Sequence, residues 1–315
     1  MRDEFIWVEK YRPKTIDDCI LPESTKKTFR EFLVKGEIPN LLLAGPPGIG
    51  KTTVAKALCA ELGVDCYVIN GSDEGRFLDT VRNQAKNFAS TVSLMDADRK
   101  HKVIIIDEAD NTTHDVQLLL RANIESFYKN CRFIFTCNFK NKIIEPLHSR
   151  TTVIDFNVRG KSKQALCVEF FNRCRDILTK EKVTFSNKVV AEVIQKYFPD
   201  FRRTLNELQR YASTGSIDTG ILATLGDAKI DTLCESMRDK KFNDVKAWVQ
   251  QNLDSDPASI MRTIYDNLTG IMDGPSTAAA VLIIADYQYK SAFVADQEVN
   301  LLACLTQLMM ECNFK

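Results

Sequence analysis

The chain has 315 residues, of which 44% are hydrophobic and 27% charged, a composition typical of a globular protein large enough for two or three domains. Its 42 basic and 42 acidic residues cancel, which excludes a chain-wide attraction to nucleic acid, so any such contact must come from a local cluster. The first residues lack an apolar signal core, and the longest apolar run, 278–285, is too short to span a bilayer, so we expect a cytoplasmic protein.

The cysteine pattern argues against a zinc site. The ten cysteines contain no Cys-x-x-Cys pair, and the chain has three histidines. Because the spacings are irregular, we expect reduced, mostly buried thiols.

The first predicted element is an extended segment from Trp7 to Pro13. Because Pro13 disfavours a helical conformation at Arg12, we expect a strap and not a helix. Its aromatic residues, Trp7 and Tyr11, could cover a nucleotide base or simply pack on the core. A helix is predicted over 23–34 and should end near a glycine at position 36.

Residues 45–52 read Gly-Pro-Pro-Gly-Ile-Gly-Lys-Thr and match the phosphate-binding pattern Gly-x-x-x-x-Gly-Lys-[Ser/Thr] at every fixed position. An apolar run at 41–44 precedes this loop, and a helical pattern over 52–62 follows it, which is the strand–loop–helix context that the motif requires. The sequence therefore predicts a site for a nucleoside triphosphate in which Lys51 reaches the outer phosphates and the Thr52 hydroxyl suits Mg²⁺. The other residues expected to bind the nucleotide here are Gly48, Ile49, Gly50 and Thr53.

Four further apolar runs, at 67–70, 103–107, 132–137 and 152–156, alternate with helical patterns. With the run at 41–44 they predict an α/β domain, a parallel sheet of five strands covered by helices on both faces. Ligands of such sheets bind at the carboxyl ends of the strands, so the chemistry should gather there.

Polar residues end two of these strands. Asp107 and Glu108 follow the third run, where Asp107 can hold Mg²⁺ and Glu108 can polarise the water that attacks the terminal phosphate. Asn138 ends the next strand and could orient that water, although an asparagine in this position is often only a turn residue.

Several basic and polar residues are candidates for DNA contacts. In the helical pattern over 81–88, Arg82 and Lys86 stand four residues apart, and like charges at that spacing repel unless a polyanion lies across them. An isolated helix of this kind is usually a solvated face. Weaker candidates are Arg76 in the preceding loop, Thr112 and Thr113, which can cap the next helix, and Arg121 on that helix.

A change of composition near 157–160 ends the strand pattern, and everything from 161 to about 220 has a helical pattern. A third helical region follows, with helix-start signals at Asp256-Pro257, Gly274-Pro275 and Asp296. We therefore predict a nucleotide-binding domain over 1–160, a small helical lid over 161–226 and an all-helical domain over 227–315.

Two adjacent arginines in the lid are expected to differ in role. Asp200 is a good N-cap, so Arg202 and Arg203 fall in the first turn of the next helix, where the helix dipole disfavours cations. Arg203 has Glu207 as a partner four residues on, whereas Arg202 faces Asn206. Arg202 is therefore predicted to be the charge that is free to bind an anion.

Four segments carry a family resemblance: Val8-Glu9-Lys10-Tyr11-Arg12-Pro13, the loop at 45–52, Asp107-Glu108-Ala109-Asp110, and the stretch from Asn138 to Arg150. They resemble AAA+ sliding-clamp-loader subunits, which include the replication factor C small subunits. The large subunit of T4-type phage clamp loaders is similar in length and also in Phe198-Pro199-Asp200-Phe201-Arg202. The clear resemblance covers roughly residues 1–215.

The resemblance implies an ATPase that uses ATP and Mg²⁺ to open a DNA polymerase clamp and load it on primer–template DNA during replication. The implied partners are the sliding clamp, the DNA and other loader subunits, including a distinct smaller one, in a ring-shaped hetero-oligomer without a membrane. The last helical domain would be its oligomerising collar, and the location would be the host-cell cytoplasm if the chain is phage-encoded.

The resemblance also implies residue roles. Asn138 matches sensor 1, Arg150 the arginine finger and Arg202 the sensor 2 arginine, while Arg82 and Lys86 match a helix that lines the DNA channel. The adenine pocket would be formed by Val8, Glu9, Lys10, Tyr11 and Ile20. One departure is that Ser149-Arg150-Thr151 stands where the family usually has Ser-Arg-Cys.

Three alternatives stay open. A protein-remodelling unfoldase would need an aromatic–apolar–Gly pore loop, and the stretch 71–77, Gly-Ser-Asp-Glu-Gly-Arg-Phe, has the wrong order. A ring helicase or branch-migration motor on DNA shares the ATP chemistry but matches the strap and finger segments less well. A scaffold that only binds nucleotide is disfavoured because the residues expected for hydrolysis are all present.

Overall fold

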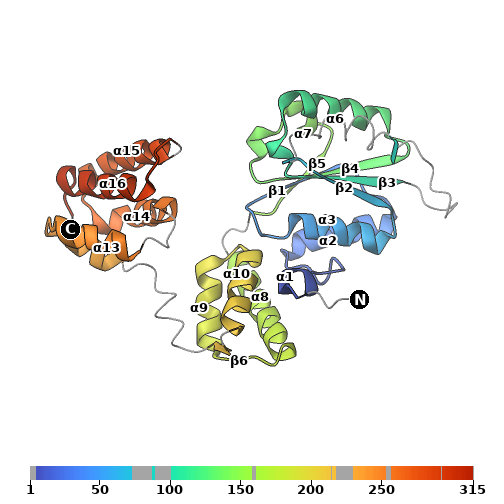
Figure 1. Cartoon of the computed structure of the whole chain (residues 1–315). Coiled ribbons are helices and arrows are strands. Elements are labelled where there is room, and N and C mark those ends of the chain that lie inside the picture. The colour runs from blue at the N-terminus through green and yellow to red at the C-terminus, as the bar shows by residue number, and fades with distance from the viewer. Residues whose placement is uncertain are drawn as a thin grey trace. The chain divides into compact units, whose positions relative to one another are not determined.

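The computed structural model describes residues 5–72, 87–88, 101–157, 161–213, 215–217, 230–252, 257–291 and 293–314. The chain falls into two compact units, 1–222 and 223–315 (Figure 1). Arg76, Arg82 and Lys86, the three candidates for DNA contacts before position 87, lie outside the described residues. Within the described ranges, no helix is both long and apolar enough to cross a membrane.

The first unit is built on a parallel sheet with the strand order β2-β3-β4-β1-β5. All five predicted apolar runs form strands within a residue of their expected bounds, which confirms the α/β prediction. The strands are β1 Leu41–Ala44, β2 Cys66–Asn70, β3 Lys102–Asp107, β4 Cys131–Cys137 and β5 Thr152–Asp155. Because Asn70 pairs with Asp107, and Ala44 with Cys137, the carboxyl ends of the central strands lie at one edge.

Helices cover both faces of this sheet, with α6 and α7 on one face and α2 and α3 on the other (Figure 1). Successive strand residues point to opposite faces, so Leu42 and Ile104 pack in the same core as Leu120, whereas Leu41 and Ile105 pack with Leu58. The helices are α2 Glu23–Lys35, α3 Lys51–Leu62, α6 His114–Ser126 and α7 Glu145–His148. Two short 3-10 turns, Ala109–Asn111 and Lys140–Lys142, follow β3 and β4.

The N-terminal segment differs from its prediction, because Trp7–Lys10 forms a one-turn helix, α1, and not an extended strap. Pro13 restricts only Arg12, so it leaves the four residues before Tyr11 free to be helical. Trp7 is buried, and its backbone N–H donates to Gln209 Oε1 at 2.9 Å. The segment is thereby attached to the lid helix that carries Gln209.

The sequence predicted an entirely helical lid, and this prediction is wrong. The lid contains α8 Lys161–Lys180, α9 Asn187–Tyr197 and α10 Phe201–Ala212, and also a parallel pair of two-residue strands, β6 Thr184–Phe185 and β7 Ser216–Ile217. Strands this short show no periodicity, so the helical patterns around them hid them in the sequence.

The second unit is a helical bundle of α12 Ile230–Arg238, α13 Phe242–Gln251, α14 Pro257–Ile271, α15 Gly274–Ser291 and α16 Gln297–Glu311. The three predicted start signals are confirmed, and the Asp296 side chain caps α16 by accepting the backbone N–H groups of Glu298 and Val299. Leu301, Leu305 and Leu308 lie in its core. Residues 218–229 are outside the described ranges, so the predicted lid boundary at 226 stays a prediction.

Candidate nucleotide-binding site

The phosphate-binding loop joins β1 to α3 and needs glycine at two positions. Gly48 and Gly50 have φ angles of 73° and 97°, in the left-handed region that disfavours other residues. A Cβ on Gly48 would also lie 1.8 Å from Asp200 Oδ1, and the Phe201 N–H donates to the Gly48 carbonyl at 3.2 Å. The start of the lid helix α10 is therefore in direct contact with the loop.

Lys51 is held at the start of α3 by oxygen acceptors that carry no charge. Its Nζ donates to the Gly45 carbonyl at 2.7 Å, to the Pro46 carbonyl at 2.9 Å and to Asn138 Oδ1 at 2.8 Å. Burial lowers the pKa of this lysine, which is 8% exposed. Among the described residues its direct partners are all neutral, and a buried ammonium of this kind is well suited to an anionic ligand.

Asp107 is fixed by two hydroxyl groups at the carboxyl end of β3. Thr52 and Thr136 both donate to its Oδ1, at 2.6 Å and 2.5 Å. Thr136 also accepts the backbone N–H of Glu108 at 3.0 Å, so one buried side chain on β4 orients both acids. Thr136 was not predicted as a site residue, although a threonine between Phe135 and Cys137 in an apolar strand is a visible signal.

Glu108 occupies the left-handed region with φ 54°, a conformation that is uncommon for a residue other than glycine. Its Oε2 accepts a hydrogen bond from the Ser72 hydroxyl and another from Asn111 Nδ2, the latter at 3.2 Å. The carboxylate is thus held beside the end of β2. Ser72 and Asn111, which hold it, were not predicted from the sequence.

Asp110 positions the strand end that carries Asn138. Its Oδ2 accepts the backbone N–H groups of Asn138 at 3.1 Å and Phe139 at 3.0 Å. Asp110 is 7% exposed, so these are hydrogen bonds to a buried carboxylate, which are among the stronger ones. The Asn138 amide is oriented toward Lys51 as a result.

A cavity of about 170 Å³ is lined by Lys51, Asp107, Glu108, Thr136 and Asn138 together with the phosphate-binding loop. The predicted site residues that meet there are Gly48, Gly50, Lys51, Thr52, Thr53, Asp107, Glu108, Asn138 and Arg202. Cationic side chains, hydroxyls and two carboxylates all line this space, and a nucleoside triphosphate with a divalent cation requires such a set of groups. Within the described ranges, no group of three or more His, Cys, Asp or Glu side chains could hold a metal ion by itself.

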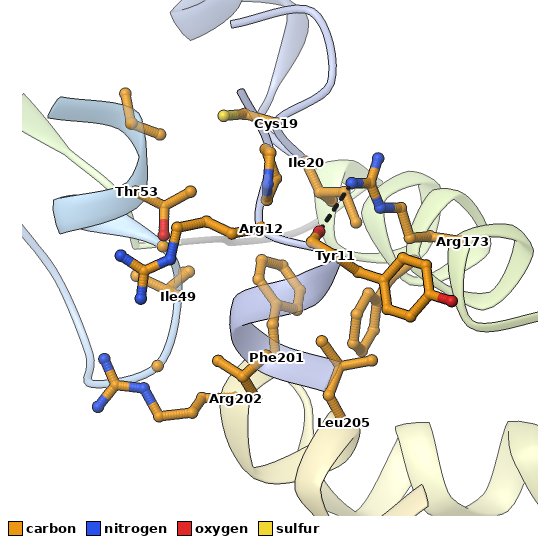
Figure 2. A pocket seen from close by; sticks show the side chains of 16 residues that line it. Tyr11, Arg12, Cys19, Ile20, Ile49, Thr53, Arg173, Phe201, Arg202 and Leu205 are labelled. Atoms are coloured by element: carbon orange, nitrogen blue, oxygen red, sulfur yellow. Dashed lines mark hydrogen bonds between the residues drawn. The ribbon is translucent and has the colours of Figure 1, made fainter. Parts of the chain in front are cut away.

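A second, apolar cavity of about 100 Å³ shares several lining residues with the first. Figure 2 shows the side chains that line it. It is lined by the predicted residues Val8, Tyr11, Ile20 and Ile49, and by Phe201 and Leu205 of the lid. Two other residues predicted for the adenine pocket line neither cavity, because Glu9 is exposed and pairs with Arg12, and Lys10 pairs with Glu181 at 2.7 Å.

Arg202 and Arg203 lie in different surroundings, as predicted, but the partner predicted for Arg203 is not the one that the structure shows. Arg202 lines both cavities, whereas Arg203 lines neither and lies over the Tyr197 ring, 4.8 Å from its centroid. The predicted pair of Arg203 and Glu207 is wrong, because Glu207 pairs with Arg210 at 2.6 Å. The aromatic ring offers Arg203 a cation–π contact that competes with an exposed ion pair.

Arg202→Ala is expected to reduce ATP affinity about 10-fold or more, because a charge-assisted hydrogen bond to phosphate is lost. Arg203→Ala should leave ATP affinity within about twofold, since its cation–π contact contributes to the lid and not to the cavity. Equilibrium binding of both variants, after a check of folding by circular dichroism, measures the difference. A larger loss in Arg203→Ala would contradict this assignment.

Arg150 lies away from both cavities. It stands in the turn before the amino end of β5, whereas the cavities lie at the carboxyl ends of the strands. Its Nε and Nη2 donate to Glu125 Oε1, at 2.9 Å and 2.5 Å, and its Nη1 donates to the Pro146 carbonyl at 3.0 Å. The guanidinium lowers the pKa of Glu125. Arg150 therefore cannot act on the nucleotide of its own chain without a large movement.

The described DNA candidates lie on or before α6. Thr113 is the N-cap residue of this helix, and its side chain makes no capping hydrogen bond. Thr112 donates to the Ala109 carbonyl at 2.6 Å, and Arg121 lies 3.9 Å from Glu125. These contacts leave the backbone N–H groups at the start of α6 without a side-chain cap.

The fold and the site define a P-loop ATPase with a lid. The family model described as "ATPase family associated with various cellular activities (AAA)" matches residues 41–158, and "Sliding-clamp-loader large subunit, AAA+ ATPase lid domain" matches residues 162–223. The chain is 36% identical to the sliding-clamp-loader large subunit of Enterobacteria phage T4, over 99% of this chain and 98% of that protein. It is 33% identical to the replication factor C small subunit of Saccharolobus solfataricus, over 99% of this chain and 96% of that protein.

The chain belongs to the family of AAA+ sliding-clamp-loader subunits, and it is an ATP hydrolase. Among solved structures, the Thermotoga maritima RuvB Holliday junction branch migration motor matches with a TM-score of 0.54 and 22% identity, over 78% of this chain and 85% of that one. This likeness shows the shared AAA+ fold alone.

Proposed function

We propose that this chain is the ATPase subunit of a clamp loader that opens a sliding clamp and loads it on primer–template DNA. The observation that carries the proposal is the cavity in which Lys51, Thr52, Asp107 and Glu108 meet, in a chain similar to clamp-loader large subunits over nearly its whole length. In this function, ATP binding and hydrolysis at this site are coupled to opening of the clamp and to its loading on DNA.

In the proposed reaction, Lys51 neutralises charge on the outer phosphates, and Asn138 orients the attacking water. Thr52 and Asp107 would hold Mg²⁺, because their oxygens lie 2.6 Å apart and are the hard ligands that this ion prefers. Bound Mg²⁺ would neutralise charge that develops on the phosphates. Glu108 would accept the proton of the water, and the αL backbone that Thr136 stabilises aims its carboxylate.

Arg150 would complete the site of a neighbouring subunit. Its position at the far edge of the sheet and its exposed pairing with Glu125 fit a residue that acts across an interface. A ring of subunits would then be needed for full turnover. The start of α6, which follows Thr112 and Thr113, would face DNA phosphates, together with Arg121 further along this helix and with Arg76, Arg82 and Lys86.

The proposed collar, residues 227–315, presents an apolar helix face that its own core does not use. In α15, Ala280, Ile283 and Ile284 are buried in the bundle. On the other side of the same helix, Leu282 is 73% exposed and Tyr289 70% exposed. A helix that is apolar on both sides is typical of one that is buried on both sides, so this face fits the collar of another loader subunit.

Replacing both Leu282 and Tyr289 by Glu should therefore prevent ring assembly while ATP still binds to the separate chain. Two buried carboxylates at a helix interface would each be strongly unfavourable. The mass of the mixture with its partner subunits, measured by analytical ultracentrifugation, tests this. Gln288→Glu, a change at an exposed polar position of α15, is the control. An unchanged complex with the double variant would contradict the proposed collar.

The proposed function is tested by ATP turnover of the assembled subunits with sliding clamp and primer–template DNA, added separately and together. Clamp and primed DNA together should stimulate turnover more than either alone. Stimulation by a four-way DNA junction without any clamp would instead favour the branch-migration motor.

A further inference from the structure

Two cysteine side chains, Cys59 and Cys66, meet on the α3 face of the sheet. Cys59 lies near the end of α3 and packs in the same core as Val103 of β3. Cys66 is the first residue of β2 and pairs with Val103 across the sheet. Tyr67 and Ile69 of β2 pack in the core on the other face, so the alternation of strand residues points Cys66 to the face that α3 covers.

The chain between the two cysteines is a tight turn that is held at both ends. α3 ends at Gly63, which has a φ angle of 63°, and the Val64 N–H donates to the Cys59 carbonyl at 3.0 Å. The Val103 N–H then donates to the Asp65 carbonyl at 2.9 Å, directly before β2 begins. This backbone brings the two thiols within hydrogen-bonding distance, with the Cys59 thiol as the donor.

The two thiols have different surroundings. All ten cysteines are free; Cys66 is exposed, whereas Cys59 is 1% exposed. The hydrogen bond from Cys59 lowers the pKa of Cys66, and the cation of Lys56 lowers it further, although partial burial and Asp65 oppose these effects. The same hydrogen bond, together with burial, raises the pKa of Cys59. An accessible thiolate beside a buried second thiol is the arrangement of a redox-active cysteine pair.

We propose that Cys59 and Cys66 form a reversible disulfide by exchange with a low-molecular-weight disulfide such as glutathione disulfide. The Cys66 thiolate attacks one sulfur of the small disulfide, whose S–S bond breaks. A mixed disulfide forms at Cys66, and the thiolate that leaves takes up the proton that Cys66 had released. Cys59 then attacks Cys66 Sγ, the bond to the second small thiol breaks, and the Cys59 proton passes to that leaving thiolate. The two protein thiols are oxidised by two electrons, and the small disulfide is reduced to two thiols.

The new bond would join two elements that hold the nucleotide site. α3 begins with Lys51 and Thr52, and Ser72, which follows β2, donates its hydroxyl to Glu108. Cys59 and Cys66 themselves line neither cavity. The pair is therefore a modification site separate from the ATP site, and it does not depend on the proposed function.

The test uses the reduced full chain, incubated with glutathione disulfide, quenched with acid and analysed by mass spectrometry. Trypsin cuts after Lys56 and Arg76, so both cysteines lie in one peptide, 57–76. In the wild type this peptide should lose the mass of two hydrogens, and dithiothreitol should restore it. Cys59→Ala should instead retain one glutathione on Cys66, because no second thiol displaces it. Cys66→Ser should show neither product.

Cys167→Ser, which removes a half-buried thiol from α8, is the matched control and should react like wild type. A wild-type peptide that stops at the glutathione adduct would show that Cys59 does not reach Cys66, and a peptide that keeps both free thiols would show that Cys66 is not reactive. Either result would overturn the inference. Both are read from the wild type, so the test stands even if the substitution at buried Cys59 destabilises the fold.

Discussion

Glu108→Gln should bind ATP within about twofold of wild type and yet hydrolyse it roughly 10³-fold more slowly, in the range of general-base contributions. Glutamine keeps the size of the side chain and can still accept a hydrogen bond from Ser72. It cannot take the proton of the attacking water, so the loss falls on the chemical step. Single-turnover hydrolysis by assembled subunits, compared with equilibrium ATP binding, separates the two effects.

Lys51→Ala is the contrasting variant for this experiment. It removes the buried cation that donates to Gly45, Pro46 and Asn138, so nucleotide binding itself should be lost. Ala60→Ser, a small change at an exposed position of the same helix away from both cavities, serves as a folding control. Equal loss of ATP binding in Glu108→Gln and Lys51→Ala would show that the two residues do not have separate roles.

The parts of the fold that depend on local patterns were predictable. Each strand of the sheet is a short apolar run with β-branched or aromatic residues, and the glycine at 36 ends α2 in the left-handed conformation expected of it. The carboxyl-end rule for parallel sheets then predicted that Asp107 and Asn138 would lie near Lys51, as they do.

The parts that depend on distant side chains were not predictable. Thr136 and Asp110 orient the site through hydrogen bonds that become visible only when β3 and β4 lie side by side. The partner predicted for Arg203 was wrong for the same reason. The rule that pairs residues four apart considers a single helix, whereas the Tyr197 ring belongs to another helix. Likewise, the apolar and polar cavities meet at Arg12, which sequence spacing alone does not reveal.

The contact between Arg150 and Glu125 connects the predicted finger to α6, the helix whose start is proposed to face DNA. Arg121 lies 3.9 Å from the same carboxylate, so Glu125 is shared between a predicted DNA residue and the predicted finger. Both pairs are exposed, and pairs of this kind contribute little to stability. A nucleotide bound to a neighbouring subunit could therefore replace Glu125 as the partner of Arg150 at a small cost in free energy.

Arg150→Ala should accordingly leave ATP binding by the isolated chain unchanged and reduce turnover of the assembled ring by about 10³-fold or more, as arginine fingers do. Arg30→Ala, which removes an exposed, paired arginine from α2, is the matched control and should keep full turnover. In a ring that contains both Arg150→Ala and Lys51→Ala subunits, some sites have an intact lysine beside an intact finger, so part of the activity should return. If no such mixture recovers any turnover although both variants enter the ring, Arg150 does not act on a neighbour's nucleotide.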